Sequence, residues 1–103
     1  GNDDVLYLLR ALAAWAWRRR DSVAWEVLKS WLPELKTRLN HRQDTGPVGF
    51  TLSYLHLYQR ASGETLALPD WGTISVGLQD DRYFFELAVF SYLLERPHAE
   101  VKD

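Results

Sequence analysis

The segment VLYLLRALAAWAW, residues 5–17, decides the fold class, because twelve of its thirteen residues are apolar and Arg10 is the exception. Asp3 and Asp4 precede it, and short acidic side chains there accept backbone N–H groups and complement the positive end of a helix. The run is too short to cross a bilayer, which takes ~20 apolar residues. The segment therefore predicts a buried or partner-packed helix that begins near Asp4.

Two apolar stripes run along this predicted helix when residues are placed about 100° apart. The first stripe, which we assign to the core, consists of Val5, Leu8, Leu12, Trp15 and Ala16. The second stripe follows the flank and consists of Leu6, Leu9, Ala13 and Trp17. One core face cannot cover both stripes, so we expect the second to meet another helix or a partner.

The composition fits a single helical domain that spans residues 1–103. A chain of this length loses about two-thirds of its unfolded surface on folding, so its core is modest. Apolar residues make up 47% and aromatic residues 14% of the chain, which excludes disorder. The formal net charge of −2 gives no field that would attract nucleic acid or anionic lipid. We therefore expect neither nucleic acid nor a membrane as a partner.

The chain contains no cysteine, which excludes disulfides, thiolate metal sites and thiol nucleophiles. The redox compartment does not follow from the sequence, and we take the cytoplasm as the default location. Methionine is also absent, even at position 1, so Gly1 indicates a tag remnant or a fragment of a longer protein.

The basic run Arg18–Arg20 and the following Asp21–Ser22 predict a tight turn into a second helix over residues 23–32. Two helices joined by two to four residues pack antiparallel, as a hairpin. Trp25 and Leu32 point nearly opposite to the face that we assign to the core. That core face consists of Val23, Ala24, Val27, Leu28 and Trp31.

The middle of the chain continues with helical segments and one polar connection. Pro33 either kinks the second helix or opens a new one that runs to Leu39. Residues 40–49 have the Gly, Pro and polar composition of a loop. Residues 50–61 have helical periodicity, and Gly63 stands where a left-handed residue would end that helix.

Residues 65–78 have β character, because two short alternating runs flank a turn that starts at Pro69. The competing interpretation is a helix that starts after Pro69. Gly72, Gly77 and the β-branched residues between them disfavour that helix. We therefore predict a short β-hairpin at 65–78.

The last predicted helix, residues 82–95, is apolar nearly all round and is capped by Asp80 or Asp81. A helix of this kind requires neighbours on most of its sides. Together the segments predict a mainly α fold, a small antiparallel helical bundle of about four helical segments with the hairpin at 65–78.

Polar residues that could support chemistry are few and scattered. His41, Arg42 and Asp44 lie within the predicted loop, and His56 lies on the flank of the next helix. They could supply a general base with an orienting carboxylate, or be a solvated loop and a helix-flank histidine. No metal-ligand spacing, phosphate loop or nucleophile elbow accompanies them. The sequence therefore assigns no catalytic, cofactor-binding or metal-binding residue, and it favours a non-catalytic function without deciding the question.

The side chains that we place away from the core, with the arginine run and the last helix, form the predicted partner interface. Trp and Arg are the side chains that dominate protein interfaces. The alternative is that our core assignment is too narrow and that these side chains are buried against the last helix. The predicted interface residues are Leu6, Trp17, Arg18, Arg19, Arg20, Trp25, Leu32, Tyr83, Phe90 and Leu94.

The sequence thus predicts a protein–protein interaction module that forms a homodimer or docks into a larger assembly. A first alternative is a small acidic binding inhibitor of the immunity or antitoxin type. Its acidic groups would be Asp70, Asp80, Asp81 and Glu86.

A second alternative is a sensor or enzyme that binds a small molecule. It would use the 40–49 loop and an aromatic pocket around Tyr54, Tyr58 and Trp71.

Overall fold

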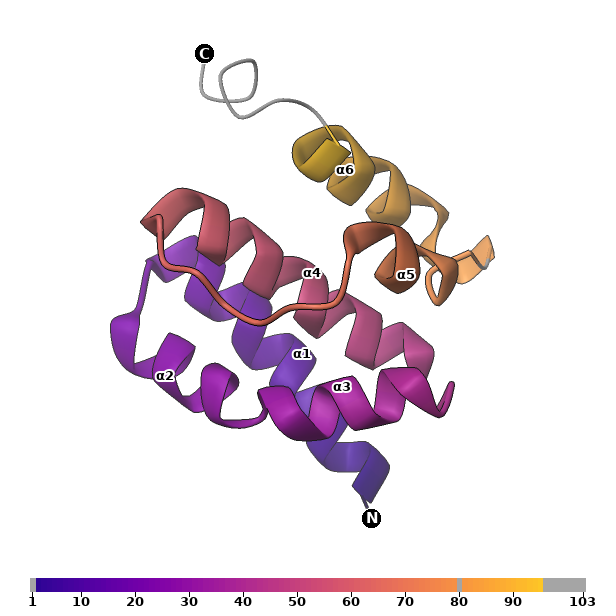
Figure 1. Ribbon diagram of the computed structural model, residues 1–103, viewed down its shortest axis with the longest axis horizontal. Coiled ribbons are helices and arrows are strands. Elements are labelled where there is room, and N and C mark those ends of the chain that lie inside the picture. The colour runs from indigo at the N-terminus through magenta and orange to yellow at the C-terminus, as the bar shows by residue number, and fades with distance from the viewer. Residues whose placement is uncertain (1, 80, 96–103) are drawn as a thin grey trace.

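Helix α4 lies at the centre of the protein, and α1, α3, α5 and α6 all pack against it, while α2 packs against α1 and α3 (Figure 1). The computed structural model describes residues 2–79 and 81–95. Within those residues the chain forms helices and no strand, which confirms the predicted mainly α class. The elements in chain order are α1 (Asn2–Arg19), α2 (Ser22–Ser30), α3 (Leu32–Asn40), α4 (Thr45–Ser62), α5 (Trp71–Val76), the 3₁₀ turn η1 (Asp81–Tyr83) and α6 (Phe84–Glu95).

The first half of α4 is buried on all its sides, from Gly46 to Ser53. Thr51 and Ser53 are buried there with their hydroxyl groups satisfied, because they donate to the carbonyls of Pro47 (2.9 Å) and Gly49 (2.7 Å). Pro47 lies in the first helical turn, where no intrahelical N–H is needed. The predicted loop at 40–49 is therefore wrong from residue 45 onward, and the connection between α3 and α4 is short.

Two glycines let other elements approach the backbone of α4 closely. A Cβ atom built on Gly46 would lie 2.3 Å from the hydroxyl oxygen of Tyr83, and one on Gly49 would lie 3.1 Å from Leu78. The glycines that suggested a loop are thus the positions where the segment from α5 to α6 rests on the central helix.

Helix α1 buries residues of both apolar stripes, the second stripe more completely than the first. Leu8 is 68% exposed, and Trp15 is also exposed. The core assignment for this helix is therefore wrong for Leu8 and Trp15 but correct for Ala16. Val5 and Leu12 pack partly against the core. Ala13 and Ala16 are small and allow the neighbouring helices to approach closely. The residues of α1 that the structure buries are Leu6, Leu9, Ala13 and Ala16.

The turn between α1 and α2 follows the prediction. Arg20 adopts a left-handed conformation (φ 56°), and Asp21 caps α2 by accepting the N–H of Ala24 at 2.9 Å. Pro33 lies in the first turn of a separate helix, α3, so the second of the two interpretations for that residue is correct.

The β-hairpin predicted at 65–78 is absent from the structure. Residues 63–70 form neither a helix nor a strand, and polar side chains of α4 bind this segment. Gln59 Oε1 accepts from Leu66 N–H (2.7 Å), and His56 Nε2 lies 2.8 Å from the carbonyl of Pro69. Residues 71–76 then form α5, because burial of Ile74 against α4 outweighs the β propensity of its neighbours.

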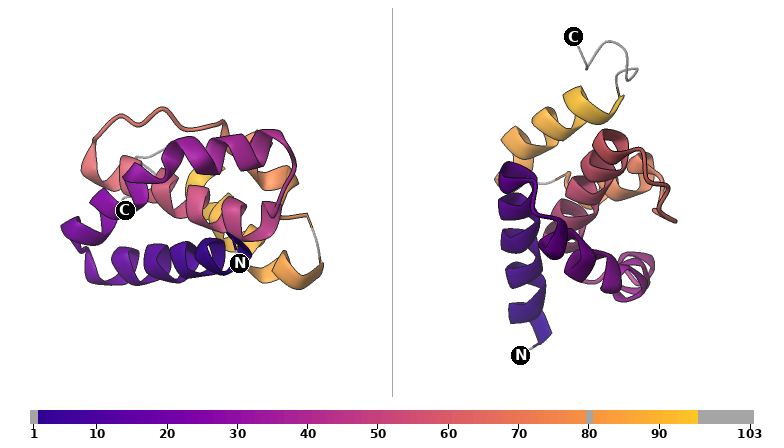
Figure 2. Two further views of the ribbon diagram at one scale, coloured as in Figure 1. Left: turned by 90° about the horizontal axis from the view of Figure 1, so that it is seen from below. Right: turned by 90° about the vertical axis from the view of Figure 1, so that its left-hand side faces the viewer.

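The last predicted helix is present as η1 followed by α6. It lies on the far side of α4 from α3, at one end of the molecule (Figure 2). The caps predicted at Asp80 and at the side chain of Asp81 lie outside the described residues.

Candidate functional site

Helix α6 carries large apolar side chains on its exposed side as well as on its buried side. Phe90 and Leu94 are buried toward α4, and they follow one edge of the helix. A second apolar stripe faces outward with the spacing i, i+3, i+4, i+7, which helices use to pack on a neighbouring helix. We call this stripe the outer face of α6, and it consists of Phe85, Ala88, Val89 and Tyr92.

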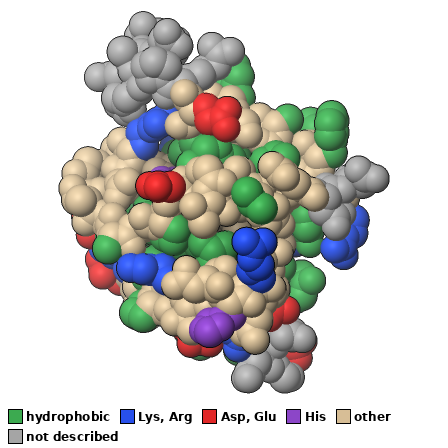
Figure 3. All heavy atoms as spheres, turned by 45° about the vertical axis from the view of Figure 1, so that its right-hand side comes forward, with side chains coloured by type: hydrophobic (Ala, Val, Ile, Leu, Met, Phe, Trp, Pro, Cys, Tyr) green, Lys and Arg blue, Asp and Glu red, His purple; other side chains and the backbone are tan. Residues whose placement is uncertain are grey.

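The outer face is open to solvent. Phe85 is 73% exposed and Tyr92 is 57% exposed, and the adjacent Phe84 is 76% exposed. In the space-filling view, hydrophobic side chains protrude from the upper right of the molecule (Figure 3). A contiguous exposed stripe of this kind marks an interaction site more often than isolated exposed residues do.

An aromatic cluster attaches the middle of α6 to α4 and α5. Phe90 lies at its centre, and its ring meets the rings of Tyr54 (5.2 Å between centroids), Phe50 (5.7 Å) and Trp71 (6.2 Å). All three pairs are edge-to-face, the geometry that the ring quadrupoles favour. The inner side of α6 is therefore already packed.

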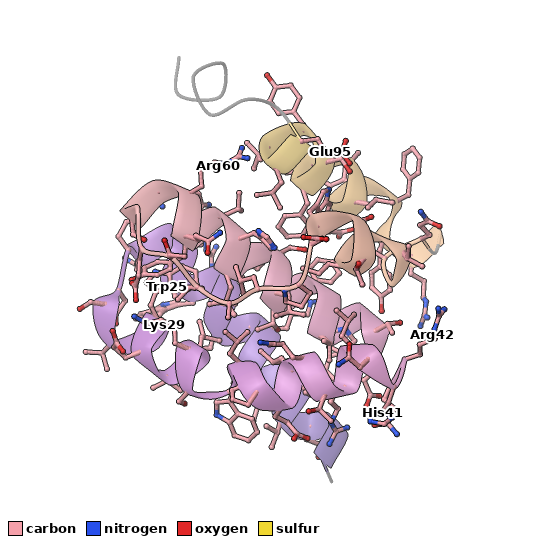
Figure 4. All side chains as sticks on the ribbon, in the orientation of Figure 1. Trp25, Lys29, His41, Arg42, Arg60 and Glu95 are labelled. Carbon is pink, nitrogen blue, oxygen red and sulfur yellow. The ribbon has the colours of Figure 1, made fainter. Side chains whose placement is uncertain are left out.

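The two ends of α6 are also tied to the rest of the chain. At the C-terminal end, the Arg60 guanidinium donates to the carbonyls of Leu93 and Leu94 (2.9 Å to the latter), and Figure 4 shows Arg60 reaching from α4 toward α6. Trp71 Nε1 donates to Glu95 Oε1 at 3.1 Å. Near the N-terminal end, Tyr83 packs edge-on against Phe50. The outer face is thus presented on a helix that several contacts hold in place.

Two adjoining hollows lie between α1 and α6, over the surface of α4. Their volumes are about 480 and 250 Å³, and Tyr54 and Glu86 line both. The larger hollow is also lined by Tyr7, Arg10, Ala11, Ala14 and Phe50. The smaller hollow is also lined by Trp17, Leu57, Phe85, Val89, Phe90 and Leu93.

Arg10 and Tyr54 contribute a charge and a hydrogen-bonding group to the hollows. The Arg10 guanidinium lies 4.0 Å from the centre of the Phe50 ring, so the one charge in the apolar run of α1 rests on α4. Burial raises the pKa of Tyr54, and the positive charges of Arg10 and Arg18 partly oppose that shift. The Tyr54 hydroxyl is therefore protonated at neutral pH and is available there as a hydrogen-bonding group, not as a base.

The structure separates the predicted interface residues instead of gathering them. Leu6 and Trp25 are buried, so for these two side chains the alternative that the core assignment was too narrow is correct, and the expectation that they project from the core is wrong. Trp25 is 3% exposed and its ring lies 4.7 Å from that of Tyr58 on α4. Leu32 is half-buried against the same core, Tyr83 is half-buried, and Phe90 and Leu94 are buried.

The arginine run remains at the surface. Arg18, Arg19 and Arg20 are exposed at the C-terminal end of α1, where cations complement the negative end of the helix. The Arg20 guanidinium lies 3.8 Å from the centre of the Trp17 ring, and Trp17 is half-buried beside the smaller hollow. Trp17 and Phe90 are thus the predicted interface residues that line this hollow.

The polar residues that could have supported chemistry also lie apart. His41 and Arg42 are exposed and project from the α3–α4 connection, away from the rest of the labelled side chains (Figure 4). Asp44 pairs with Arg38 at 3.0 Å. His56 Nε2 lies 2.8 Å from the carbonyl of Pro69, in the segment before α5.

The described residues that the two alternative functions would use do not come together at one site either. Asp70 is exposed and Glu86 lines the hollows, while Asp80 and the side chain of Asp81 lie outside the described residues. Of the three predicted pocket aromatics, Tyr54 and Trp71 meet at Phe90, whereas Tyr58 stacks on Trp25.

The sequence analysis recognised that the last helix is apolar nearly all round, but Phe90 and Leu94, which it named on this helix, are buried. The signal that identifies the outer face is the spacing of Phe85, Ala88, Val89 and Tyr92. At about 100° per residue, this stripe lies on the side of α6 that faces away from Phe90 and Leu94.

Among the residues that the structure describes, no three His, Cys, Asp or Glu side chains come together as a metal site. No helix in the same ranges is both long and apolar enough to span a membrane. Comparison with known proteins finds no family model, no curated protein and no solved structure that matches the chain.

Proposed function

We propose that the chain is a non-catalytic protein-interaction domain that binds its partner through the outer face of α6. The observation that carries the proposal is the exposure of Phe85 and Tyr92 on a helix whose opposite side is already packed. Covering a large apolar side chain is worth ~1.5–3 kcal/mol relative to leaving it in water. A partner that covers the stripe removes the exposed parts of Phe85, Val89 and Tyr92 from water.

The attachment of α6 supports a docking function for its outer face. Arg60 holds the C-terminal carbonyls of α6, and Phe90 anchors its middle among three rings. A surface that is fixed before binding loses little conformational entropy when the partner arrives. This favours specific binding over loose hydrophobic contact.

The smaller hollow supports the proposal because it adjoins the outer face. Phe85 and Val89 line its rim, and Trp17 and Tyr54 lie within it. Interfaces concentrate their binding free energy where an aromatic or aliphatic anchor fills such a pocket. A partner that covers Phe85 and Val89 is in position to insert a side chain there.

Site-specific photo-crosslinking in the cells that produce the protein tests this proposal. A photoreactive phenylalanine analogue replaces Phe85 in one variant and Val23 in a matched control. Val23 is 72% exposed on α2, so it is an equally accessible apolar position away from α6. We expect discrete protein adducts from position 85 that position 23 does not form.

The mass of the adduct identifies the partner class. A band at twice the mass of the chain indicates self-association, and any other discrete band indicates a different protein, so either result supports the proposal. Position 85 yielding no adduct beyond those of position 23 would contradict it.

A further inference from the structure

We infer that the two hollows between α1 and α6 form one binding site for a free aromatic α-amino acid. Its carboxylate pairs with Arg10, its ammonium pairs with Glu86, and its ring lies in the smaller hollow. The inference goes beyond the proposed function, because its ligand is a small molecule that would compete with a protein partner only for the smaller hollow. Three features lead to it: two opposite charges that do not pair with each other, a hydroxyl group near both, and an aromatic hollow beside them.

Arg10 of α1 supplies the positive charge of the site. Its side chain is half-buried and lines the larger hollow, with the guanidinium 4.0 Å from the centre of the Phe50 ring. Within residues 2–79 and 81–95, this guanidinium makes no ion pair and donates no hydrogen bond. A guanidinium has five N–H donors, and the ring covers only one of its faces. The donors of Arg10 are therefore able to bind a carboxylate in the hollow, with two parallel hydrogen bonds.

Glu86 of α6 supplies the negative charge from the other side of the site. It is half-buried and lines both hollows. Its carboxylate pairs with no side chain in the described part of the chain, and Arg10 is included in that statement although it lines the same hollow. Two opposite charges that share a hollow without forming a salt bridge are complementary to a ligand that carries both charges.

The hydroxyl group of Tyr54 lies near both charges. Burial raises the pKa of Tyr54, the positive charge of Arg10 opposes this rise, and the negative charge of Glu86 adds to it, so both charges act on the hydroxyl. Tyr54 also lines both hollows. A protonated hydroxyl donates to a carboxylate or accepts from an ammonium. The charged end of an amino acid would thus contact one side chain each from α1, α4 and α6.

The smaller hollow suits the aromatic ring of the ligand. Its volume is about 250 Å³, and the rings of Trp17 and Phe90 line it together with Leu57 and Leu93. Aromatic rings pack well against such side chains, and edge-to-face contacts add to the gain from burial. Ligand pockets measure ~300–1,000 Å³ and combine apolar walls with a few polar groups, as these two adjoining hollows do.

The two charges select among the ligands that an aromatic hollow could hold. An aryl carboxylate would satisfy Arg10 and leave Glu86 beside a second negative charge, and an aryl amine would satisfy Glu86 alone. The terminal residue of a peptide carries one of the two charges, whereas a free amino acid carries both on one carbon atom. The combination of both charges with a ring therefore favours the free aromatic amino acid.

A titration with matched ligands, followed by the backbone amide chemical shifts in NMR spectra, tests the ligand class. The probes are L-phenylalanine and L-tryptophan, and we expect at least one to bind saturably with a dissociation constant of about 10 µM–1 mM, a range suited to its size. The N-acetyl derivative of that amino acid lacks the ammonium and its amide derivative lacks the carboxylate, so each should bind at least about 10-fold more weakly. Glycine carries both charges but no ring and should give no saturable shift.

Two variants that remove one charge each test the roles of Arg10 and Glu86. Arg10→Gln should weaken binding of the free amino acid at least about 10-fold without weakening the amide derivative, which has no carboxylate. Glu86→Gln should weaken the free amino acid to a similar extent without weakening the N-acetyl derivative, which has no ammonium. A change that only disturbed the fold would weaken all ligands alike. Arg19→Gln is the matched control, because Arg19 is exposed on α1 and lines neither hollow.

The inference is overturned if neither amino acid gives saturable shifts up to about 10 mM. It is also overturned if the N-acetyl or the amide derivative binds as tightly as the free amino acid, because the site would then recognise a ring and a single charge. Equal weakening of all ligands by Arg10→Gln or Glu86→Gln would show that the residue supports the fold and does not bind the ligand. None of these results bears on the proposed function, which fails only if photo-crosslinking at position 85 captures no protein beyond the control.

Discussion

At the scale of single residues, small side chains on α4 determine where the C-terminal part of the chain rests. Tyr83 lies against Gly46, and Leu78 lies against Gly49. Both contacts lie on the part of α4 that is buried on all its sides. The position of α6, and therefore of its outer face, depends on how closely these residues can approach.

Gly46→Ala tests the closeness of this approach. The new Cβ would fall 2.3 Å from the Tyr83 hydroxyl oxygen and 2.7 Å from Cζ, so the ring must move. We expect a loss of about 1–2 kcal/mol in the free energy of unfolding, because overpacking outweighs the better helix propensity of alanine. Gly72→Ala is the matched control: it has open space around it and should be stabilising or neutral in the same urea titration. A stable Gly46→Ala protein would show that Tyr83 does not depend on this contact.

Trp25 and Val23 distinguish the buried side of α2 from its exposed side. It is buried and stacks on Tyr58, whereas its neighbour Val23 is exposed. Trp25→Ala should therefore cost about 3–5 kcal/mol of unfolding free energy, and Val23→Ala should cost less than about 0.5 kcal/mol. Thermal unfolding of both variants measures these two losses of stability. If Trp25→Ala were as stable as Val23→Ala, the indole would not belong to the core.

Which side chains of a helix point into the core was difficult to predict from the sequence. Two stripes on α1 were visible, but the pattern alone did not say which one packs, and the larger side chains of Leu8 and Trp15 suggested the wrong one. The structure buries Leu9 and Ala13 of the second stripe together with Ala16 of the first. The size of a side chain indicates how much its burial would stabilise the fold. Which stripe is buried depends on how closely the neighbouring helix approaches, and that is not visible in the sequence of α1 alone.

At the scale of elements, α6 depends on a side chain of another helix for its C-terminal cap. Arg60 of α4 donates to the carbonyls of Leu93 and Leu94, which have no intrahelical partner. Arg60→Gln should lower global stability by about 1 kcal/mol and raise amide hydrogen exchange in the peptide 84–95. Arg19→Gln, at an exposed position of α1, should leave that peptide unchanged. Equal exchange in both variants would show that Arg60 does not hold the helix.

A second polar contact ties α2 to the end of α4. Lys29 of α2 donates to Glu64 at 2.8 Å, and Tyr58 donates to the other oxygen of the same carboxylate. The Lys29 ammonium and the Tyr58 hydroxyl lower the pKa of Glu64, and the bond to Glu64 raises the pKa of Tyr58. The three side chains therefore resist titration at both ends of the pH range.

The sign of the pH dependence follows from these directions. Because the folded pKa of Glu64 is lowered, its contribution is complete above ~4.3 and is lost as pH falls through the folded value. Because the folded pKa of Tyr58 is raised, its contribution is complete below ~10 and is lost as pH rises through the folded value. Urea unfolding should show Glu64→Gln less stable than the unmodified chain at pH 7, with the difference shrinking in acid. A difference that stays constant down to pH ~3 would contradict this assignment.

Element types were predictable where local signals and burial agree. The cap at Asp21, the left-handed Gly63 (φ 76°) and the apolar run at 84–95 all follow the sequence. Residues 65–70 differ because side chains of α4, not a second strand, bind their backbone, and residues 71–76 differ because they form α5. The local pattern of this segment does not reveal these side-chain contacts, since Gln59 and His56 lie on a different element, α4.

At the scale of the whole molecule, the fold is complete without the outer face of α6. The Cα radius of gyration is 12.8 Å, close to the ~13 Å of a compact domain of this length. Two packed clusters form the interior, one between α1 and α4 with α2, α3 and α5, and one around Phe90. None of the four residues of the outer face belongs to either cluster, so stability and association should be separable.

Paired substitution of Phe85→Glu and Val89→Glu tests this separation. Both side chains are exposed, so the free energy of unfolding measured at low concentration should change by less than about 0.5 kcal/mol. Where the unmodified chain self-associates, small-angle scattering should show that the paired variant keeps the mass of one chain as concentration rises, because two carboxylates now lie in the apolar contact. Leu8→Glu is the control, since it places a glutamate on an exposed apolar position of α1 and should leave association intact. If the paired variant unfolds while Leu8→Glu does not, Phe85 and Val89 serve the fold of the single chain, and the outer face is not a surface kept for a partner.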